Sequence, residues 1–294
     1  MTSHPEAEQA FAFECQGDHL VGILHPSATR GRRGVLVVVG GGPQYRVGGH
    51  RQLTLWSRHL SANGYPVMRF DYRGMGDSHG EFLGFEHIGD DIRAALDEFF
   101  ARVPELQEVV LWGECDAASA ILFYAHADPR VKGAVLLNPW VRTEAGAARA
   151  TLRFYYLRRL TQPSFWAKVF SLRFNPIAAV ASMLSLVRQV RAPKASTPGS
   201  SAPAAPDRDS TRPLPERMLS GLVRFRAPLL LVLGGRDLIA REFDLLTGNS
   251  THWQTELQRE TVSRRDLPEG DHTFSSASQR DQVADWALAW IRGW

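Results

Sequence analysis

The sequence has few of the features that mark secreted, membrane-spanning or nucleic-acid-binding proteins. Only two of its 294 residues are cysteine, which argues against a disulfide framework and predicts a reducing, cytoplasmic setting. No apolar run approaches the roughly 18 residues of a membrane span, and the first residues lack the pattern of an export signal. Zinc-finger spacings and the aromatic signature of single-strand binders are also missing, so we expect no nucleic acid partner.

The net charge is only +3, but the basic residues are unevenly distributed. Residues 141–221 carry 13 Lys and Arg against four Asp and Glu, so this segment is +9 and the remainder is −6. A basic segment on an acidic body predicts a polyanionic partner, an anionic substrate or a membrane surface. Aromatic and basic residues alternate within 149–159, which predicts a helix that either packs over a pocket or makes peripheral membrane contact.

Strand-like apolar runs alternate with helical patterns through most of the chain. Residues 10–15 and 19–24 flank a Gln-Gly-Asp turn and predict an N-terminal hairpin. Further strands are predicted at 35–39, 66–70, 108–112, 131–137, 228–233 and 260–263, and helices at 50–62, 89–102, 117–126 and 277–294. This alternation predicts an α/β fold with a mostly parallel, eight-stranded sheet and helices on both faces.

Residues 141–221 interrupt that alternation. Their first part has a helical and basic pattern, whereas residues 192–215 are rich in Pro, Ala and Ser, a composition typical of a flexible segment. We therefore expect a core formed by residues 1–140 and 222–294, with residues 141–221 inserted after the sixth strand as a basic helical cap or lid.

The most informative stretch is L-W-G-E-C-D-A, residues 111–117. It predicts a strand, a sharp turn and a helix, with Cys115 at the apex and the small residues Gly113 and Ala117 where strand and helix approach. Enzymes that form acyl intermediates present their nucleophile on such a turn, usually spelled G-x-S-x-G. Here the attacking atom would be sulfur, which reacts as the thiolate. The alternative is an inert buried cysteine, the interpretation favoured for Cys15.

Two further residues complete a predicted triad in the order nucleophile, acid, base. Asp237 follows an apolar strand and a Gly-Gly-Arg turn, and His272 lies on the loop between the last strand and the last helix. Asp237 would fix the tautomer of His272, which would serve as general base and then acid. Ser119 lies a full turn into the helix after Cys115 and is a poor rival nucleophile.

The oxyanion of an acyl-transfer reaction needs backbone donors. One should be the N–H of Asp116, the residue after the nucleophile. The second should come from the loop G-G-G-P-Q at residues 40–44; Pro43 has no N–H, and we favour Gly42 over Gln44. The helix N-terminus at Asp116 favours a thiolate, whereas the Glu114 and Asp116 carboxylates oppose it. The sequence leaves open which effect prevails.

The residues after this glycine loop form a polar cluster. Gln44, Tyr45 and Arg46 are candidate substrate contacts, with a solvated helix start as the alternative. His19, His25, His126 and His252 have no partners at metal-ligand spacing, and no dinucleotide fingerprint is present. We therefore expect neither a metal nor a cofactor.

Two motifs carry a resemblance to known families. The sequence F-D-Y-R-G-M-G-D-S at residues 70–78 resembles the corresponding loop of α/β-hydrolases of the serine aminopeptidase and monoacylglycerol lipase type, which implies that Asp71 and Arg73 link loops behind the active site. The residues 41–48, 50–52 and 115–120 look like the type 1 hydrolase associated with the exosortase A system, encoded beside bacterial exopolysaccharide and PEP-CTERM sorting genes. This resemblance supports the same triad and implies an accessory, cytoplasmic role.

We therefore expect an α/β-hydrolase fold and an enzyme that hydrolyses or transfers an ester- or thioester-linked acyl group through a covalent cysteine acyl-enzyme. Its substrate would be a small molecule or a saccharide- or lipid-linked acyl compound. Two alternatives remain: an acyltransferase acting on a saccharide or lipid-linked carrier, and a catalytically degenerate hydrolase that serves as a binding or assembly factor.

Overall fold

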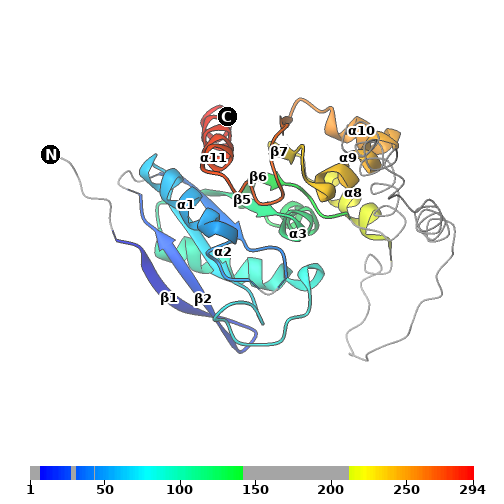
Figure 1. The fold of residues 1–294 in the computed structure, drawn as a ribbon. Coiled ribbons are helices and arrows are strands. Elements are labelled where there is room, and N and C mark those ends of the chain that lie inside the picture. Colours follow the sequence, from blue (N-terminus) through cyan, green and yellow to red (C-terminus); the bar gives the residue numbers. More distant parts are fainter. Residues whose placement is uncertain (1–6, 28–30, 43, 142–211) are drawn as a thin grey trace, which may run out of the picture.

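A computed structural model describes residues 7–27, 31–42, 44–141 and 212–294 (Figure 1). Most of the expected cap, including the predicted flexible segment 192–215 up to residue 211, lies outside the described residues. Within them, no helix is long and apolar enough to cross a membrane.

The centre of the molecule is one eight-stranded sheet in the order β1-β2-β4-β3-β5-β6-β7-β8. The first two strands and β4 pair antiparallel, and all other neighbours are parallel. The predicted α/β architecture with a mostly parallel sheet is confirmed. Its strands are β1 (Gln9–Cys15), β2 (Asp18–His25), β3 (Arg33–Val38), β4 (Val67–Asp71), β5 (Glu108–Glu114), β6 (Val131–Leu137), β7 (Leu229–Gly234) and β8 (Val262–Leu267).

Helices cover both faces of the sheet because successive side chains of a strand point to opposite sides. On one face, Trp112 of β5 packs on Trp56 of α1 (Gln52–Ala62), with ring centroids 5.2 Å apart. On the other face, a Cβ on Gly113 would lie only 2.6 Å from Ile121 in α3 (Asp116–Tyr124). Contacts between helices extend both layers, α1 with α11 (Ala277–Arg292) and α3 with α2 (Gly89–Arg102).

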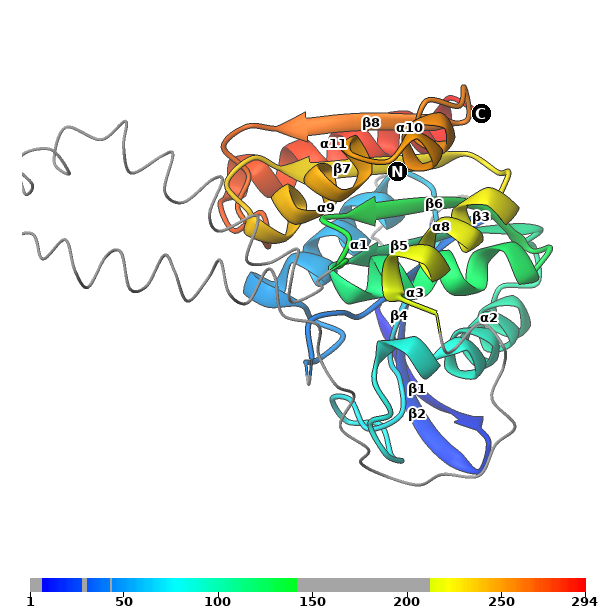
Figure 2. The same ribbon diagram turned by 90° about the vertical axis from the view of Figure 1, so that its right-hand side faces the viewer.

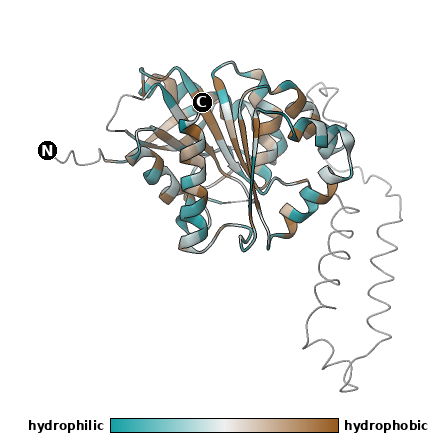
Figure 3. Ribbon diagram, turned by 90° about the horizontal axis from the view of Figure 1, so that it is seen from above, coloured by the Kyte–Doolittle hydropathy of each residue, from teal (hydrophilic) through white to brown (hydrophobic). Residues whose placement is uncertain are grey.

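Hydropathy follows this layering (Figure 3). The strands near the centre of the sheet are mostly hydrophobic, and strands β3 and β7 are buried over nearly their whole length. A strand buried on both faces is a continuous apolar run, the pattern that predicted β3 and β7. Parallel strands also place their carboxyl ends at one edge of the sheet, as the arrowheads of β6 and β8 show in Figure 2.

Several elements differ from the sequence expectation or extend it. Strand β8 runs to Leu267, four residues beyond its predicted end; this end was missed because charged and half-exposed side chains at the sheet edge give no apolar signal. The helices α8 (Leu214–Arg224), α9 (Leu238–Gly248) and α10 (Thr251–Leu257) were not predicted. The helix predicted from residue 50 begins as a 3₁₀ turn, Gly49–Arg51, and becomes α-helical at Gln52.

The chain returns from the undescribed segment through α8 (Leu214–Arg224). This helix packs on α3 so closely that a Cβ on Gly221 would lie 1.9 Å from the carbonyl oxygen of Leu122. The expected end of the insertion, residue 221, therefore falls inside a helix that packs against the core.

Candidate active site

The turn between β5 and α3 holds Cys115 in a backbone conformation that few side chains adopt. Cys115 has φ 59° and ψ −124°, and its N–H donates to the carbonyl of Leu137 at 2.9 Å. A Cβ on Gly113 would also lie 2.8 Å from the carbonyl carbon of Ala117. Strand β5 and helix α3 can therefore approach this closely only because Gly113 and Ala117 are small, and the close approach requires a sharp turn at Cys115. Strained φ and ψ angles of this kind concentrate at functional sites.

Cys115, His272 and Asp237 come together at the carboxyl edge of the sheet. The Nδ1 of His272 is 2.9 Å from the Asp237 Oδ2. Cys115 and His272 line the same cavity, and they are close enough for each to shift the pKa of the other. Asp237 is itself fixed as the N-cap of α9, where its carboxylate accepts from the N–H groups of Ile239 and Ala240. The buried carboxylate, the imidazole and the sulfur atom therefore lie together at this edge.

Electrostatics keep protons on the thiol and the imidazole. Burial raises the pKa of the Cys115 thiol, and the Asp116 carboxylate adds to this, against the lowering by His272. Hydrogen bonds to Asp237 and then to Cys115 raise the pKa of His272 to about 10. Both directions favour a protonated thiol over a resting thiolate, so we expect that a proton has to leave this pair before nucleophilic attack.

The Asp116 side chain lies at the glycine loop that was expected to bind the oxyanion. The Gly41 N–H donates to the Asp116 Oδ1 at 2.6 Å, and the neighbouring Gly42 N–H lowers the pKa of this carboxylate. This contact forms because a carboxylate at the start of α3 lies within reach of the glycine loop, where backbone N–H groups attract an anion. The oxyanion role of the Gly42 and Asp116 N–H groups stays a prediction.

A cavity of about 40 Å³ adjoins the sulfur. It is lined by Val38, Gly40, Gly41, Gln44, Gly48, Gly49, Gln52, Leu53, Glu114, Cys115, His272 and Thr273. The Gln52 Nε2 donates to the Glu114 Oε2, and burial raises the pKa of Glu114 to about 8. No group of three or more His, Cys, Asp or Glu side chains within the described ranges is placed to hold a metal ion.

Comparison with protein families assigns the chain to one of them. Residues 33–273 match the serine aminopeptidase S33 family. The chain belongs to this family. Its fold is that of the α/β-hydrolases, although the residue at the apex of the turn is Cys115 where the family description names a serine. Among curated proteins, none matches the chain.

Solved structures share the fold of this S33 family member. The esterase Pf2001 of Pyrococcus furiosus is similar with a TM-score of 0.64 at 14% identity, over 98% of this chain and 91% of that one. The esterase domain of a Rhodothermus marinus protein gives a TM-score of 0.57 at 18% identity, over 97% and 98%. An acylaminoacyl peptidase of Pyrococcus horikoshii gives a TM-score of 0.60 at 14% identity, over 99% of this chain and 42% of that one.

The three expected substrate contacts of this S33 family member lie in different surroundings. Gln44 lines the cavity, and its Nε2 donates to the carbonyl of Gly41 at 3.2 Å. Tyr45 is 55% exposed and does not line the cavity. The Arg46 guanidinium is paired with Asp71 and with Asp77, the latter at 2.9 Å. The buried carboxylate of Asp71 requires such a charged partner. Substrate contact by Arg46 stays a prediction.

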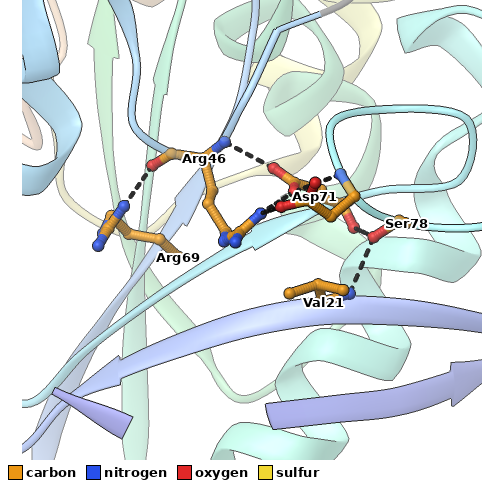
Figure 4. A network of polar contacts seen from close by, with 6 residues as sticks. Val21, Arg46, Arg69, Asp71 and Ser78 are labelled. Carbon is orange, nitrogen blue, oxygen red and sulfur yellow. Dashed lines mark hydrogen bonds and ion pairs between the residues drawn. The ribbon is translucent and has the colours of Figure 1, made fainter. Parts of the chain in front are cut away.

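This ion pair is part of a network that anchors the glycine loop (Figure 4). The Arg46 N–H donates to the Asp71 Oδ1 at 2.6 Å, and the Arg46 carbonyl accepts from Arg69 at 2.6 Å. Ser78 Oγ donates to the Asp71 carbonyl and accepts from the Val21 N–H. Nearby, Arg73 and Asp91 form a bidentate pair. The linking role predicted for Asp71 and Arg73 thus agrees with their contacts.

Three further residues belong to the site but were not predicted. Asn138, which follows β6, donates from Nδ2 to the carbonyl of His272 at 2.9 Å and accepts from the Gly234 N–H at 2.7 Å. A polar residue directly after an apolar strand and before a proline was the available signal for Asn138. Glu114 was considered only for its charge, and Gln52 was not singled out, because their contact spans 62 residues of sequence.

Proposed function

We propose that this S33 family member is an acyl hydrolase or acyltransferase that carries the acyl group as a thioester on Cys115. The supporting observation is that Asp237 pairs with the His272 ring, which lines the same cavity as the Cys115 sulfur and interacts with it. A thiol suits such chemistry because sulfur is a strong nucleophile once deprotonated, and the resulting thioester is open to attack by water or by another nucleophile. The esterase fold of the structural neighbours is consistent with this reaction class.

The imidazolium of His272 first loses a proton to solvent; the neutral ring then takes the thiol proton, and the sulfur attacks the carbonyl carbon of the substrate. Asp237 holds the imidazolium through Nδ1, and backbone donors near Gly42 and Asp116 hold the oxyanion after the Asp116 carboxylate has turned away. His272 then protonates the leaving group as its bond to carbon breaks. In the second half, His272 takes a proton from water or an acceptor alcohol, which attacks the thioester, and the Cys115 sulfur leaves.

The test is a burst experiment with p-nitrophenyl acetate. Wild-type protein should release p-nitrophenolate in a rapid phase and carry one acetyl group on Cys115 by intact-mass and peptide analysis. The matched control is the chain's other buried cysteine, since Cys15 lies at the end of β1 and is also free. Cys15→Ala should keep the burst, whereas Cys115→Ala should lose it. A burst and adduct that persist in Cys115→Ala would contradict the proposal.

A second candidate is a binding factor without turnover. The observation that favours it is the Asp116 carboxylate, which already bonds to the Gly41 and Gly42 N–H groups. A protein of this kind would fail to acylate with any activated ester and would also resist iodoacetamide at Cys115. Reaction with iodoacetamide combined with acylation excludes this candidate.

An accessory role in bacterial exopolysaccharide and exosortase systems rests on the resemblance of residues 41–52 and 115–120 to the exosortase-associated hydrolases. Peripheral contact with a membrane through the basic segment would place such an enzyme near lipid-linked substrates. That segment lies mostly outside the described residues, so its basic composition is the support. Co-sedimentation of the full chain with anionic but not neutral vesicles is the expected result, and equal recovery with both would contradict it.

A further inference from the structure

Two buried oxygen atoms in the cavity beside Cys115 have no hydrogen-bond partner among the residues that the structure describes. They are the Oε1 of Gln52 and the Oε1 of Glu114. Gln52 is only 1% exposed, and both residues line the cavity. A buried acceptor without a partner costs about 1–3 kcal/mol, so this pair is a feature that a ligand would complete.

The hydrogen-bonding properties of Gln52 and Glu114 indicate which chemical group of a ligand fits between them. Gln52 Oε1 only accepts hydrogen bonds, whereas Glu114 accepts as a carboxylate and donates when protonated. A hydroxyl both donates and accepts, so it satisfies Glu114 in either state. An anionic group is disfavoured because the carboxylates of Asp116 and Asp237 lie close by.

The geometry and size of the cavity define the ligand further. Because Gln52 Nε2 bonds to Glu114 Oε2, the two unpartnered oxygens belong to one side-chain pair and invite two neighbouring hydroxyls. The volume of about 40 Å³ is room for roughly three water molecules. This matches a two- or three-carbon end of a molecule.

We propose that the cavity binds the terminal 1,2-diol of a polyol, which accepts the acyl group from Cys115. One hydroxyl donates to Gln52 Oε1 and its neighbour bonds to Glu114 Oε1, and whichever oxygen lies nearer the sulfur attacks the thioester carbonyl carbon. His272 removes the proton of that hydroxyl, the carbon–sulfur bond breaks, and the proton passes to the Cys115 sulfur, leaving an ester and a free thiol. This inference names the acceptor class for the proposed acyl chemistry and rests on it.

The first experiment tests the binding site without acyl chemistry. Alkylation of Cys115 by iodoacetamide is followed by intact mass in the presence of 1,2-propanediol or 1-propanol at equal concentration. These alcohols have the same carbon chain, so only the second hydroxyl differs. We expect the diol to protect Cys115 about tenfold better, equivalent to about 1.4 kcal/mol. Equal protection by the two alcohols would overturn the proposal and indicate a water-filled site or a closed acid–amide pair.

The second experiment measures how the acetyl-enzyme partitions between water and each alcohol, with the monoester quantified by gas chromatography. Wild-type protein should favour the diol over 1-propanol about tenfold, and the double variant Gln52→Met/Glu114→Met should lose this preference. Replacing both partners with apolar groups avoids leaving one of them buried and unsatisfied. The matched control is Gln258→Met/Glu260→Met, a pair of the same types that is exposed before β8.

The outcomes separate this inference from the proposed function. Protection by the diol without any acylation leaves the binding site standing and removes the acyl function. Acylation with equal partitioning leaves the function standing and overturns the diol site. A preference that survives in the Gln52→Met/Glu114→Met variant also overturns it. If that variant does not fold, as judged by circular dichroism, the wild-type comparison of the two alcohols still decides.

Discussion

Two regions adjoin the glycine loop, the network around Asp71 and the cavity beside Cys115. They differ in whether their buried oxygen atoms have hydrogen-bond partners. Both carboxylate oxygens of Asp71 are bonded, one to the Arg46 N–H and the other to the Arg46 guanidinium and the Asp77 N–H. In the cavity, one oxygen each of Glu114 and Gln52 has no partner among the described residues. Cys115 itself holds a strained backbone conformation.

This contrast separates scaffold from site. In the Asp71 network, every charged group is already paired, so the network holds the loop in one position and cannot bind a ligand. The cavity beside Cys115 contains a strained backbone, groups with raised pKa values and unpartnered oxygens. These features cost stability, and they serve a function only when a substrate binds. Changes in the first region should therefore affect stability, and changes in the second should affect activity.

The largest effect should come from Asp237→Asn, which removes the charge of the side chain but keeps its size and shape. Asparagine is also a good N-cap, so α9 should keep its start, while His272 loses the carboxylate that selects its tautomer. We expect kcat/KM for p-nitrophenyl acetate to fall by about 10⁴-fold, or about 5.5 kcal/mol, with little change in Tm. Asp266→Asn, on the exposed edge strand, is the control. A fall below tenfold would remove Asp237 from the triad.

The next effect tests the scaffold. Asp71→Ala leaves the Arg46 guanidinium, 15% exposed, without its buried partner, and breaking such a pair costs about 3–5 kcal/mol. Urea unfolding should report this loss. The control is Asp77→Ala, because Asp77 pairs with the same guanidinium but is 53% exposed, so it should cost no more than about 1 kcal/mol. Equal losses in both variants would show that burial does not set the strength of this network.

The pH dependence tests the proton balance of the site. Below the raised pKa values, the Cys115 thiol and the His272 imidazolium both hold protons, and one proton has to leave before attack. Raising the pH removes it, so kcat/KM should climb about tenfold per pH unit and continue into the alkaline range. Rates are corrected with the Cys115→Ala variant for hydroxide-driven hydrolysis. A plateau already reached below neutral pH would contradict the stated directions of these pKa shifts.

The smallest effect should come from Asp116→Ala, and it is an increase. This change frees the Gly41 and Gly42 N–H groups and removes a carboxylate that raises the thiol pKa. We expect kcat/KM to rise several-fold and the pH profile to move to lower pH. Asp116→Asn separates the two causes, because it removes the charge and keeps an acceptor oxygen. Lower activity in Asp116→Ala would assign Asp116 to the scaffold.

Much of the fold could be predicted because its signals are local. The N-terminal hairpin, the apolar runs of β3 and β7 and the amphipathic stripe of α2 each lie within a few consecutive residues. The full length of β8 was missed because an edge strand with charged side chains lacks an apolar run. The helices α9 and α10 were missed because they are short and separated only by Asn249 and Ser250, so neither gives a long periodic apolar pattern.

The site was predictable where residue order carries the information. The positions of Cys115, Asp237 and His272 follow from strand ends, and the structure brings these residues together. Pairings across long sequence distances carry no such signal, as Arg46 with Asp71 and Gln52 with Glu114 illustrate. The occupation of the glycine loop by Asp116 was likewise invisible, because it depends on the direction of one side chain.

Asn138 connects the loops that carry Asp237 and His272. Its single amide joins the Gly234 N–H, at the start of the turn that leads to Asp237, to the carbonyl of His272. The loops of Asp237 and His272 are thereby both held at the end of β6, so a movement that releases one loop disturbs the other. Partial unfolding of these loops should abolish activity in a single step, at a lower temperature than the unfolding of the whole molecule.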